Sequence, residues 1–156
     1  MTPREQRTDR GAAWVWVQSI LLAALLAAGP LGAGSWHSPA LVAAGGLLFL
    51  LAGALGVAGV VQLGRNRTPF PRPRAGSALV RHGVYRWVRH PLYLSVMGAS
   101  LGWSLMFQSA AALAVAAGVA GFLDAKARSE ERWLVAAFPD YTDYAARVRR
   151  FIPGIY

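Results

Sequence analysis

The chain has 156 residues, of which 55% are hydrophobic, and its mean hydropathy is +0.36. This is too apolar for a soluble domain of that size and indicates an integral membrane protein. The absence of cysteine excludes disulfides, thiolate catalysis and cysteine-based metal sites. The three histidines, His37, His82 and His90, lack the spacing of a zinc site, so we expect no protein-bound metal.

The net charge is +9. A basic chain can bind nucleic acid or anionic lipid, and the distribution of its charges along the sequence helps to decide between them. Arginines gather in the N-terminal tail, between the second and third apolar stretches, and in the C-terminal tail. The connections near residues 35–38 and 108 contain no lysine or arginine, so the positive-inside rule places both termini in the cytoplasm. The orientation of the chain in the membrane, together with attraction to anionic lipid headgroups, accounts for most of these arginines. We therefore expect membrane lipids as partners and no nucleic acid.

Four apolar stretches, at residues 12–34, 39–63, 92–107 and 109–125, predict an all-α membrane bundle of about four transmembrane helices. The first stretch is longer than a signal-peptide core and a second follows it closely, which favours a signal anchor. The last two could form one long stretch, but Gln108 and Ser109 offer a short turn between two antiparallel spans.

The second stretch is rich in glycine and alanine, which let helices approach closely. We expect it to pack inside the bundle rather than to form a dimer, and the oligomeric state stays open. Alternate prolines in residues 68–74 predict an extended connector. The chain is divided into an N-terminal two-span hairpin, residues 1–63, and a second portion, residues 64–156, with two further spans and a polar loop and tail.

Beyond the fourth span we expect the helix to continue as an amphipathic, cytoplasmic segment over residues 126–138. Pro139 stops this helix, and Asp140 can cap a last short helix that runs to about Arg149.

Two polar clusters flank the last apolar region. The first contains Tyr85, Arg89, His90 and Tyr93, with Pro91 suited to be the first residue of the third span. The second is the Glu130-Glu131 pair beyond the fourth span. Spans joined by a tight turn are neighbours, so the two clusters should meet at one face of the membrane. They predict either a ligand site or a surface ion-pair network, and the whole set favours the ligand site.

The sequence Gly83-Val84-Tyr85 followed by Arg89-His90-Pro91-Leu92-Tyr93 resembles the G-x-Y…R-H-P-x-Y signature of the isoprenylcysteine carboxyl methyltransferase and phospholipid methyltransferase group. The tail is also similar, through Glu130-Glu131, Phe138, Tyr141, Tyr144, Arg147 and Pro153. The resemblance covers residues 64–153. Pro139 and Arg149 stand where the group usually has glycine and proline.

This resemblance implies a methyltransferase with a cytoplasm-facing pocket for S-adenosylmethionine beside a lipid-accessible tunnel. In this family Glu130 would take the amino group of the cofactor. By position, the residues implied to bind the cofactor are Ser77, Leu79, Val80, Tyr85, Arg89, His90, Pro91, Tyr93 and Glu130.

The resemblance also implies catalytic positions that hold or activate the acceptor. Lys126 occupies a position where the family has arginine, and Arg128 is a second candidate. A carboxylate acceptor is already a nucleophile and needs no base, which favours O-methylation of a lipid-like or other amphiphilic molecule. An amine acceptor would have to lose a proton, and Glu131, His90 or Tyr93 would assist.

Two other functions compete with this interpretation. The C-terminal sequence Ile152-Pro153-Gly154-Ile155-Tyr156 is similar to that of membrane sterol reductases, which use NADPH, although Glu130-Glu131 favours the methyltransferase. The chain could also be a membrane scaffold that binds neither cofactor. Its abundance of alanine, glycine and arginine, with a single lysine, points to a GC-rich bacterium and hence to a cytoplasmic membrane.

Overall fold

The computed structural model describes residues 11–66, 68 and 76–156, so the predicted extended connector falls almost wholly outside the described residues. Among the described residues, the regular elements are all helices and the strand-like pairing is limited to one isolated bridge, which confirms the all-α prediction. The helices are α2 (Ala12–Leu31), α3 (Pro39–Leu63), α4 (Pro91–Met106), α5 (Ala110–Ala137) and α6 (Tyr141–Arg147), with short 3₁₀ turns η1 (Gly64–Asn66) and η2 (Gly83–Arg86).

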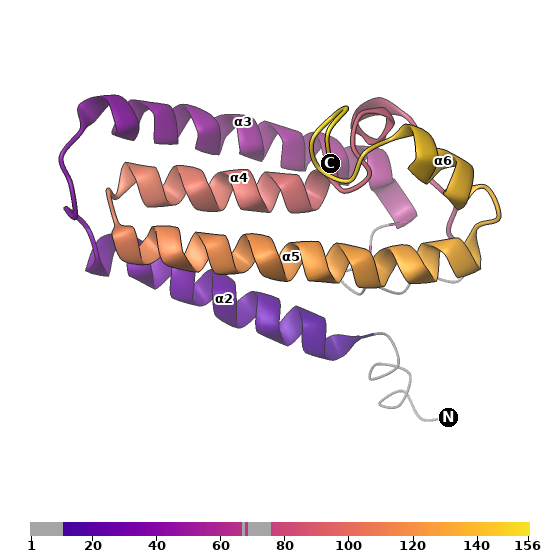
Figure 1. The fold of residues 1–156 in the computed structure, drawn as a ribbon, viewed down its shortest axis with the longest axis horizontal. Helices are drawn as coiled ribbons and strands as arrows, with labels where there is room; N and C mark the ends of the chain where they lie inside the picture. The colour runs from indigo at the N-terminus through magenta and orange to yellow at the C-terminus, as the bar shows by residue number, and fades with distance from the viewer. Residues whose placement is uncertain (1–10, 67, 69–75) are drawn as a thin grey trace.

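The four predicted spans correspond to α2, α3, α4 and α5. Within the described residues, three helices are long and apolar enough to cross a membrane, namely Ala12–Leu31, Pro39–Asn66 and Ala110–Ala137. Helix α4 has 16 residues and is about 24 Å long at 1.5 Å per residue. It is therefore shorter than the roughly 30 Å hydrocarbon core, and it lies between α3 and α5 (Figure 1).

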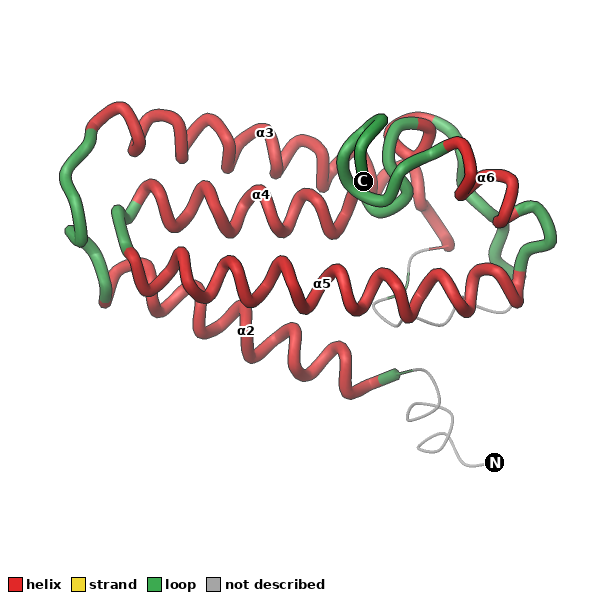
Figure 2. The backbone as a smooth tube through the Cα atoms, viewed as in Figure 1, coloured by secondary structure: helices red, strands yellow, loops and turns green. Residues whose placement is uncertain are grey.

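The helices lie side by side in the order α3, α4, α5 and α2 (Figure 1). The α2–α3 and α4–α5 connections share one end of the bundle, and α6, the η2 loop and the C-terminal tail share the other (Figure 2). The first two helices thus pack mainly through different partners, α2 on α5 and α3 on α4. The division of the chain at residue 63 remains a prediction.

The turn predicted at Gln108 and Ser109 separates α4 from α5. Gln108 adopts a left-handed backbone conformation with φ 51°, and its carbonyl accepts a hydrogen bond from the Ser35 amide at 2.8 Å. The Ser109 hydroxyl donates to the Ala28 carbonyl at 2.7 Å and accepts from the Ala112 amide at the start of α5. These bonds join both connections and hold α2 beside α5.

The end of α5 and the start of α6 partly follow the prediction. Helix α5 continues to Ala137, which confirms its extension past the apolar stretch, and α6 ends at Arg147 rather than at Arg149. The capping prediction for Asp140 is wrong, because its side chain makes no capping hydrogen bond. Asp140 has φ −80° and ψ 0°, not the extended backbone of a typical cap, and its carboxylate pairs with Arg81 at 3.5 Å.

Small residues let α3 and α4 pack with their backbones almost in contact. A Cβ atom placed on Gly102 would lie 2.7 Å from the Gly45 carbonyl oxygen and 2.8 Å from the Phe49 amide nitrogen. A Cβ atom on Gly46, by contrast, would meet no atom within 4 Å. The glycines of α3 therefore serve internal packing on one face, as expected, and the other face is open.

We expect Gly102→Ala to destabilise the protein by about 1–3 kcal/mol, because the new methyl group meets backbone atoms that cannot move aside. The matched control Gly46→Ala should be neutral or stabilise by up to about 1 kcal/mol, since it gains helix propensity in open space. Thermal unfolding in detergent measures both. Equal effects of the two variants would contradict this packing.

Candidate active site

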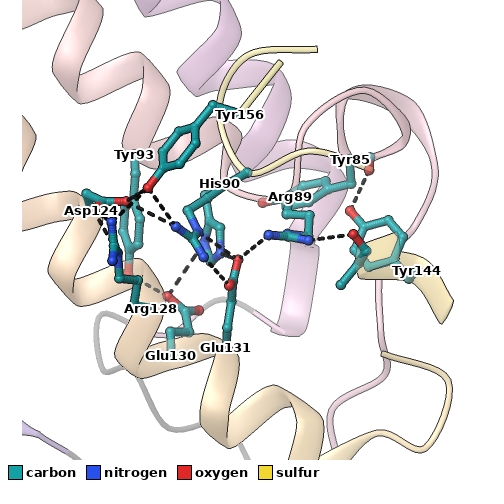
Figure 3. A network of polar contacts seen from close by, with 12 residues as sticks. Tyr85, Arg89, His90, Tyr93, Asp124, Arg128, Glu130, Glu131, Tyr144 and Tyr156 are labelled. Atoms are coloured by element: carbon teal, nitrogen blue, oxygen red, sulfur yellow. Dashed lines mark hydrogen bonds and ion pairs between the residues drawn. The ribbon is translucent and has the colours of Figure 1, made fainter. Parts of the chain in front are cut away.

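The polar end of the bundle results from the unequal lengths of α4 and α5. Pro91 begins α4, where its missing N–H costs no helical hydrogen bond. Helix α5 is 28 residues long and runs past the start of α4, so it carries Glu130 and Glu131 to the level of His90. The two clusters predicted to meet at one face of the membrane do meet (Figure 3).

One cavity lies at this end, between the segment around residues 77–80, the start of α4, the end of α5, and α6. All nine residues implied to bind a cofactor line it, namely Ser77, Leu79, Val80, Tyr85, Arg89, His90, Pro91, Tyr93 and Glu130. Their role in binding stays a prediction. Asn66, Tyr141 and Tyr144 also line the cavity and were given no role from the sequence. The spacing of three between the two tyrosines, which puts both on one face of a helix, is the signal that could have identified them.

Glu130 faces the cavity and is held by Tyr93. The Tyr93 hydroxyl donates a hydrogen bond to Glu130 Oε2 at 2.6 Å. The His90 ring stacks on the Tyr93 ring, with centroids 5.3 Å apart and planes 5° apart. His90 Nδ1 lies 3.9 Å from Glu130 Oε2. The carboxylate of Glu130 therefore lies beside the aromatic rings of Tyr93 and His90 (Figure 3).

Glu131 makes a denser set of contacts than its neighbour. Its carboxylate pairs with Arg89 Nη2 at 3.0 Å, with Arg150 Nη2 at 2.8 Å and with His90 Nε2 at 3.1 Å. Its side chain is only 15% exposed. The hydrogen bond to Glu131 raises the pKa of Arg150 above its usual high value, so this guanidinium stays charged. Glu131 thus joins the start of α4 to the tail rather than lining the cavity.

The C-terminal tail fixes the backbone of the Arg-His pair. Val88 and Arg149 form a parallel bridge, in which the Arg89 amide donates to the Arg149 carbonyl at 2.9 Å. The His90 amide donates to the Arg150 carbonyl at 3.2 Å. Sequence reasoning missed this contact, because nothing in the tail distinguishes Arg150 from its neighbouring arginines.

The tyrosines around the cavity remain neutral hydrogen-bond donors. Burial raises the pKa of Tyr144 to about 12, and its hydroxyl donates to the Tyr85 carbonyl. Burial, followed by the charge of Glu130, raises the pKa of Tyr85. Burial likewise raises the pKa of Tyr141.

Two residues that line the cavity each have a buried polar atom with no hydrogen-bond partner among the described residues. The atoms are Arg89 Nε and the Tyr141 hydroxyl. The other end of the Arg89 guanidinium is fixed by Glu131 and by the Ala145 carbonyl, at 2.7 Å from Nη1. A buried polar group without a partner is costly, and both atoms belong to residues that line the cavity.

The three predicted catalytic residues, Lys126, Arg128 and Glu131, are not among the residues that line the cavity. Lys126 is only 3% exposed, donates to Gln18 of α2 at 2.6 Å, and lies 5.4 Å from the centroid of the Tyr93 ring. Arg128 is exposed and pairs with Asp124 at 2.8 Å. A direct catalytic role for these three side chains stays a prediction.

Comparison with known proteins identifies the family. A family model described as phospholipid methyltransferase matches residues 40–140. The chain belongs to the phospholipid methyltransferase family. This confirms the resemblance drawn from the sequence motifs, and with the apolar helices it makes the chain a membrane protein of a methyltransferase family.

Several known proteins are similar to this chain. The cobalt-zinc-cadmium resistance protein CzcN of Cupriavidus metallidurans is 35% identical over 144 residues, which is 91% of this chain and 62% of the relative. The nickel-cobalt-cadmium resistance protein NccN of Alcaligenes xylosoxydans xylosoxydans is 34% identical over 146 residues, 91% of this chain and 63% of the relative. This chain therefore spans less than two thirds of their length.

A methanethiol S-methyltransferase of Mycobacterium tuberculosis is 38% identical over 73 residues, 46% of this chain and 29% of the relative. The solved structure is the eukaryotic intramembrane Ras methyltransferase ICMT, an isoprenylcysteine carboxyl methyltransferase. It aligns with a TM-score of 0.69 at 23% identity, over 99% of this chain and 55% of the other. At that identity the match shows a shared fold.

We expect Phe151→Ala to loosen the tail from the Arg-His pair, because Phe151 is 5% exposed and its ring packs 6.1 Å from that of His90. Loss of about 3 kcal/mol of local packing corresponds to roughly 100-fold faster exchange of the Arg89 and His90 amide hydrogens. Ile152→Ala, at a half-exposed neighbouring position, is the control and should leave this exchange unchanged. Unchanged protection in Phe151→Ala would show that the tail is held by other contacts.

Proposed function

We propose that this protein is an S-adenosylmethionine-dependent methyltransferase that acts on an apolar or amphiphilic acceptor reached from the membrane. Family membership supports methyl transfer. The observation that carries the donor assignment is the set of polar residues that line this cavity, namely Glu130, Arg89 and Tyr141.

These groups fit the chemistry of the donor. Its ammonium group requires an anionic partner, and Glu130 supplies one. Its carboxylate requires a donor, and Arg89 lines the same cavity. Leu79 and Val80 provide an apolar wall for the adenine ring. The faces of Tyr93 and His90 suit a sulfonium cation.

The donor supplies an activated methyl group, so the contribution of the protein is to position the reactants and exclude water. Positioning alone can contribute several kcal/mol to the lowering of the barrier. The cavity lies at the end of a membrane bundle, where a water-soluble donor and an apolar acceptor can both arrive. Two relatives are named for resistance to metal ions, and we extend to this chain only the methyl transfer that the family shares.

We expect Glu130→Gln to weaken S-adenosylmethionine binding by about 10- to 100-fold, since a charge-assisted hydrogen bond contributes about 1.5–3 kcal/mol. Asp143→Asn is the control, because Asp143 is an exposed acid of α6 outside the cavity. Isothermal titration calorimetry on purified protein measures both. NADPH binding in place of S-adenosylmethionine would favour a reductase, and binding of neither would favour a scaffold.

We further propose that the protein lies in a bacterial cytoplasmic membrane with its cavity on the cytoplasmic side. The described arginines support this orientation, since Arg65, Arg81, Arg86 and Arg149 all lie at the cavity end and residues 32–38 carry none.

The orientation is tested by single cysteines, each unique because the natural chain has none. His37 and His82 are exposed and lie at opposite ends of the bundle. We expect His37→Cys to react with a membrane-impermeant maleimide on intact cells, and His82→Cys to react only after permeabilisation. The reverse pattern would place the cavity on the outer side.

A further inference from the structure

We propose that Asn66 recognises the adenine ring of the donor by donating a hydrogen bond from Nδ2 to a ring nitrogen, while its Oδ1 holds the adjoining segment of the chain. The inference rests on the proposed function, because it concerns how the same donor molecule is selected. It starts from two amide side chains near the cavity end of α3, Gln62 in the last turn of that helix and Asn66 in η1.

Gln62 and Asn66 each hold the backbone of another segment. Gln62 Oε1 accepts a hydrogen bond from the Val84 amide at 2.6 Å, next to the left-handed turn at Gly83 (φ 59°). Asn66 Oδ1 accepts one from the Ala78 amide at 3.0 Å. A backbone N–H can only donate, so in both side chains the oxygen, and not the nitrogen, faces the backbone. With its oxygen engaged, each side chain still offers the donors of its NH2 group.

The cavity distinguishes these two amides. Asn66 lines it, whereas Gln62 is not among its lining residues. The hydrogen bond to Ala78 joins Asn66 to the segment that contains Leu79 and Val80, the apolar residues proposed to pack on the adenine ring. Asn66 is therefore placed to offer a hydrogen-bond donor to a ligand at this wall, and Gln62 is placed only to support the backbone.

The chemistry of adenine fits a donor at this wall. The ring has nitrogens that only accept hydrogen bonds and an exocyclic amine that donates. The NH2 group of Asn66 can bond to a ring nitrogen but not to the amine. Contact with Leu79 and Val80 would favour any flat apolar ring, because burial of apolar surface is not directional. Selection of adenine needs a directional polar group, since such a group rejects an analogue that leaves it unpaired.

Binding of S-adenosylhomocysteine, the demethylated product, tests this role without depending on activity or on the acceptor. It is compared with a set of analogues, in each of which a different accepting nitrogen of the adenine ring is replaced by CH. Isothermal titration calorimetry measures each affinity. We expect the natural protein to bind one of these analogues about 3- to 10-fold more weakly, as for the loss of one neutral hydrogen bond, and the others nearly as well as the product.

Asn66→Asp removes the donor and keeps an oxygen for the Ala78 amide. We expect this variant to bind S-adenosylhomocysteine about 10-fold more weakly, because a carboxylate oxygen would face the lone pair of the ring nitrogen. It should bind the sensitive analogue within about 2-fold of the natural protein, because that analogue has no nitrogen to pair. Gln62→Glu is the matched control, with the same change of amide to carboxylate, and should leave every affinity unchanged.

Hydrogen exchange separates recognition of the ligand from support of the backbone. Exchange of the Ala78 amide should be about 3- to 10-fold faster in Asn66→Ala, which loses the acceptor of that hydrogen bond. In Asn66→Asp it should stay as slow as in the natural protein. A variant that loses affinity only because the segment has moved would instead show faster exchange.

Equal binding of every analogue by the natural protein would overturn the inference. So would an Asn66→Asp variant that still discriminates against the same analogue, or one in which exchange of the Ala78 amide is as fast as in Asn66→Ala. Each of these outcomes leaves the proposed function intact. Failure of the natural protein to bind either S-adenosylmethionine or S-adenosylhomocysteine would instead remove the proposed function.

Discussion

The site depends on the carboxylate of Glu131. It pairs with Arg89 and His90 at the start of α4 and with Arg150 in the tail, so two separate segments converge on one side chain of α5. Removing one member of such a partly buried cluster leaves the other charges uncompensated, which costs more than the pair contributes. The η2–α4 junction, α5 and the tail are therefore expected to order together, and the cavity between them exists only when all three are in place.

The membrane imposes the second constraint. Helix α5 has 28 residues and α4 has 16, about 42 Å and 24 Å respectively, against a hydrocarbon core of about 30 Å. The surplus of α5 must therefore extend beyond the core, and it carries both glutamates. At their shared end near Gln108 the two helices are level, so all of the difference appears at the other end. We therefore expect the cavity to lie near the boundary between water and lipid, where charged groups can be solvated while the site is assembled.

The sequence predicted the features that depend on the type of residue at each position. It missed the contacts that depend on which residue of another segment lies opposite. The four apolar stretches predicted α2 to α5, and the motif predicted nine residues that line one cavity. Glycine content indicated close packing of α3, but not that Gly45 would face Gly102 on α4. Lys126 lies beside Gln18 because α2 packs on α5, a contact between helices far apart in the chain that no local periodicity reveals. The role of Arg150 was hidden for the same reason, since the tail contains several equivalent arginines.

The adjacent acids Glu130 and Glu131 of α5 lie in different surroundings. Neighbouring residues of a helix point about 100° apart, so one carboxylate lines the cavity and the other meets Arg89 and Arg150. Glu131 is paired with two guanidinium groups, whereas Glu130 accepts a hydrogen bond from Tyr93 and lines the cavity. His90 lies between them and contacts both. Because α5 is a continuous helix through this pair, its backbone alone directs the two carboxylates to different surroundings, and the proposed roles of holding the site and binding the donor require neither side chain to move.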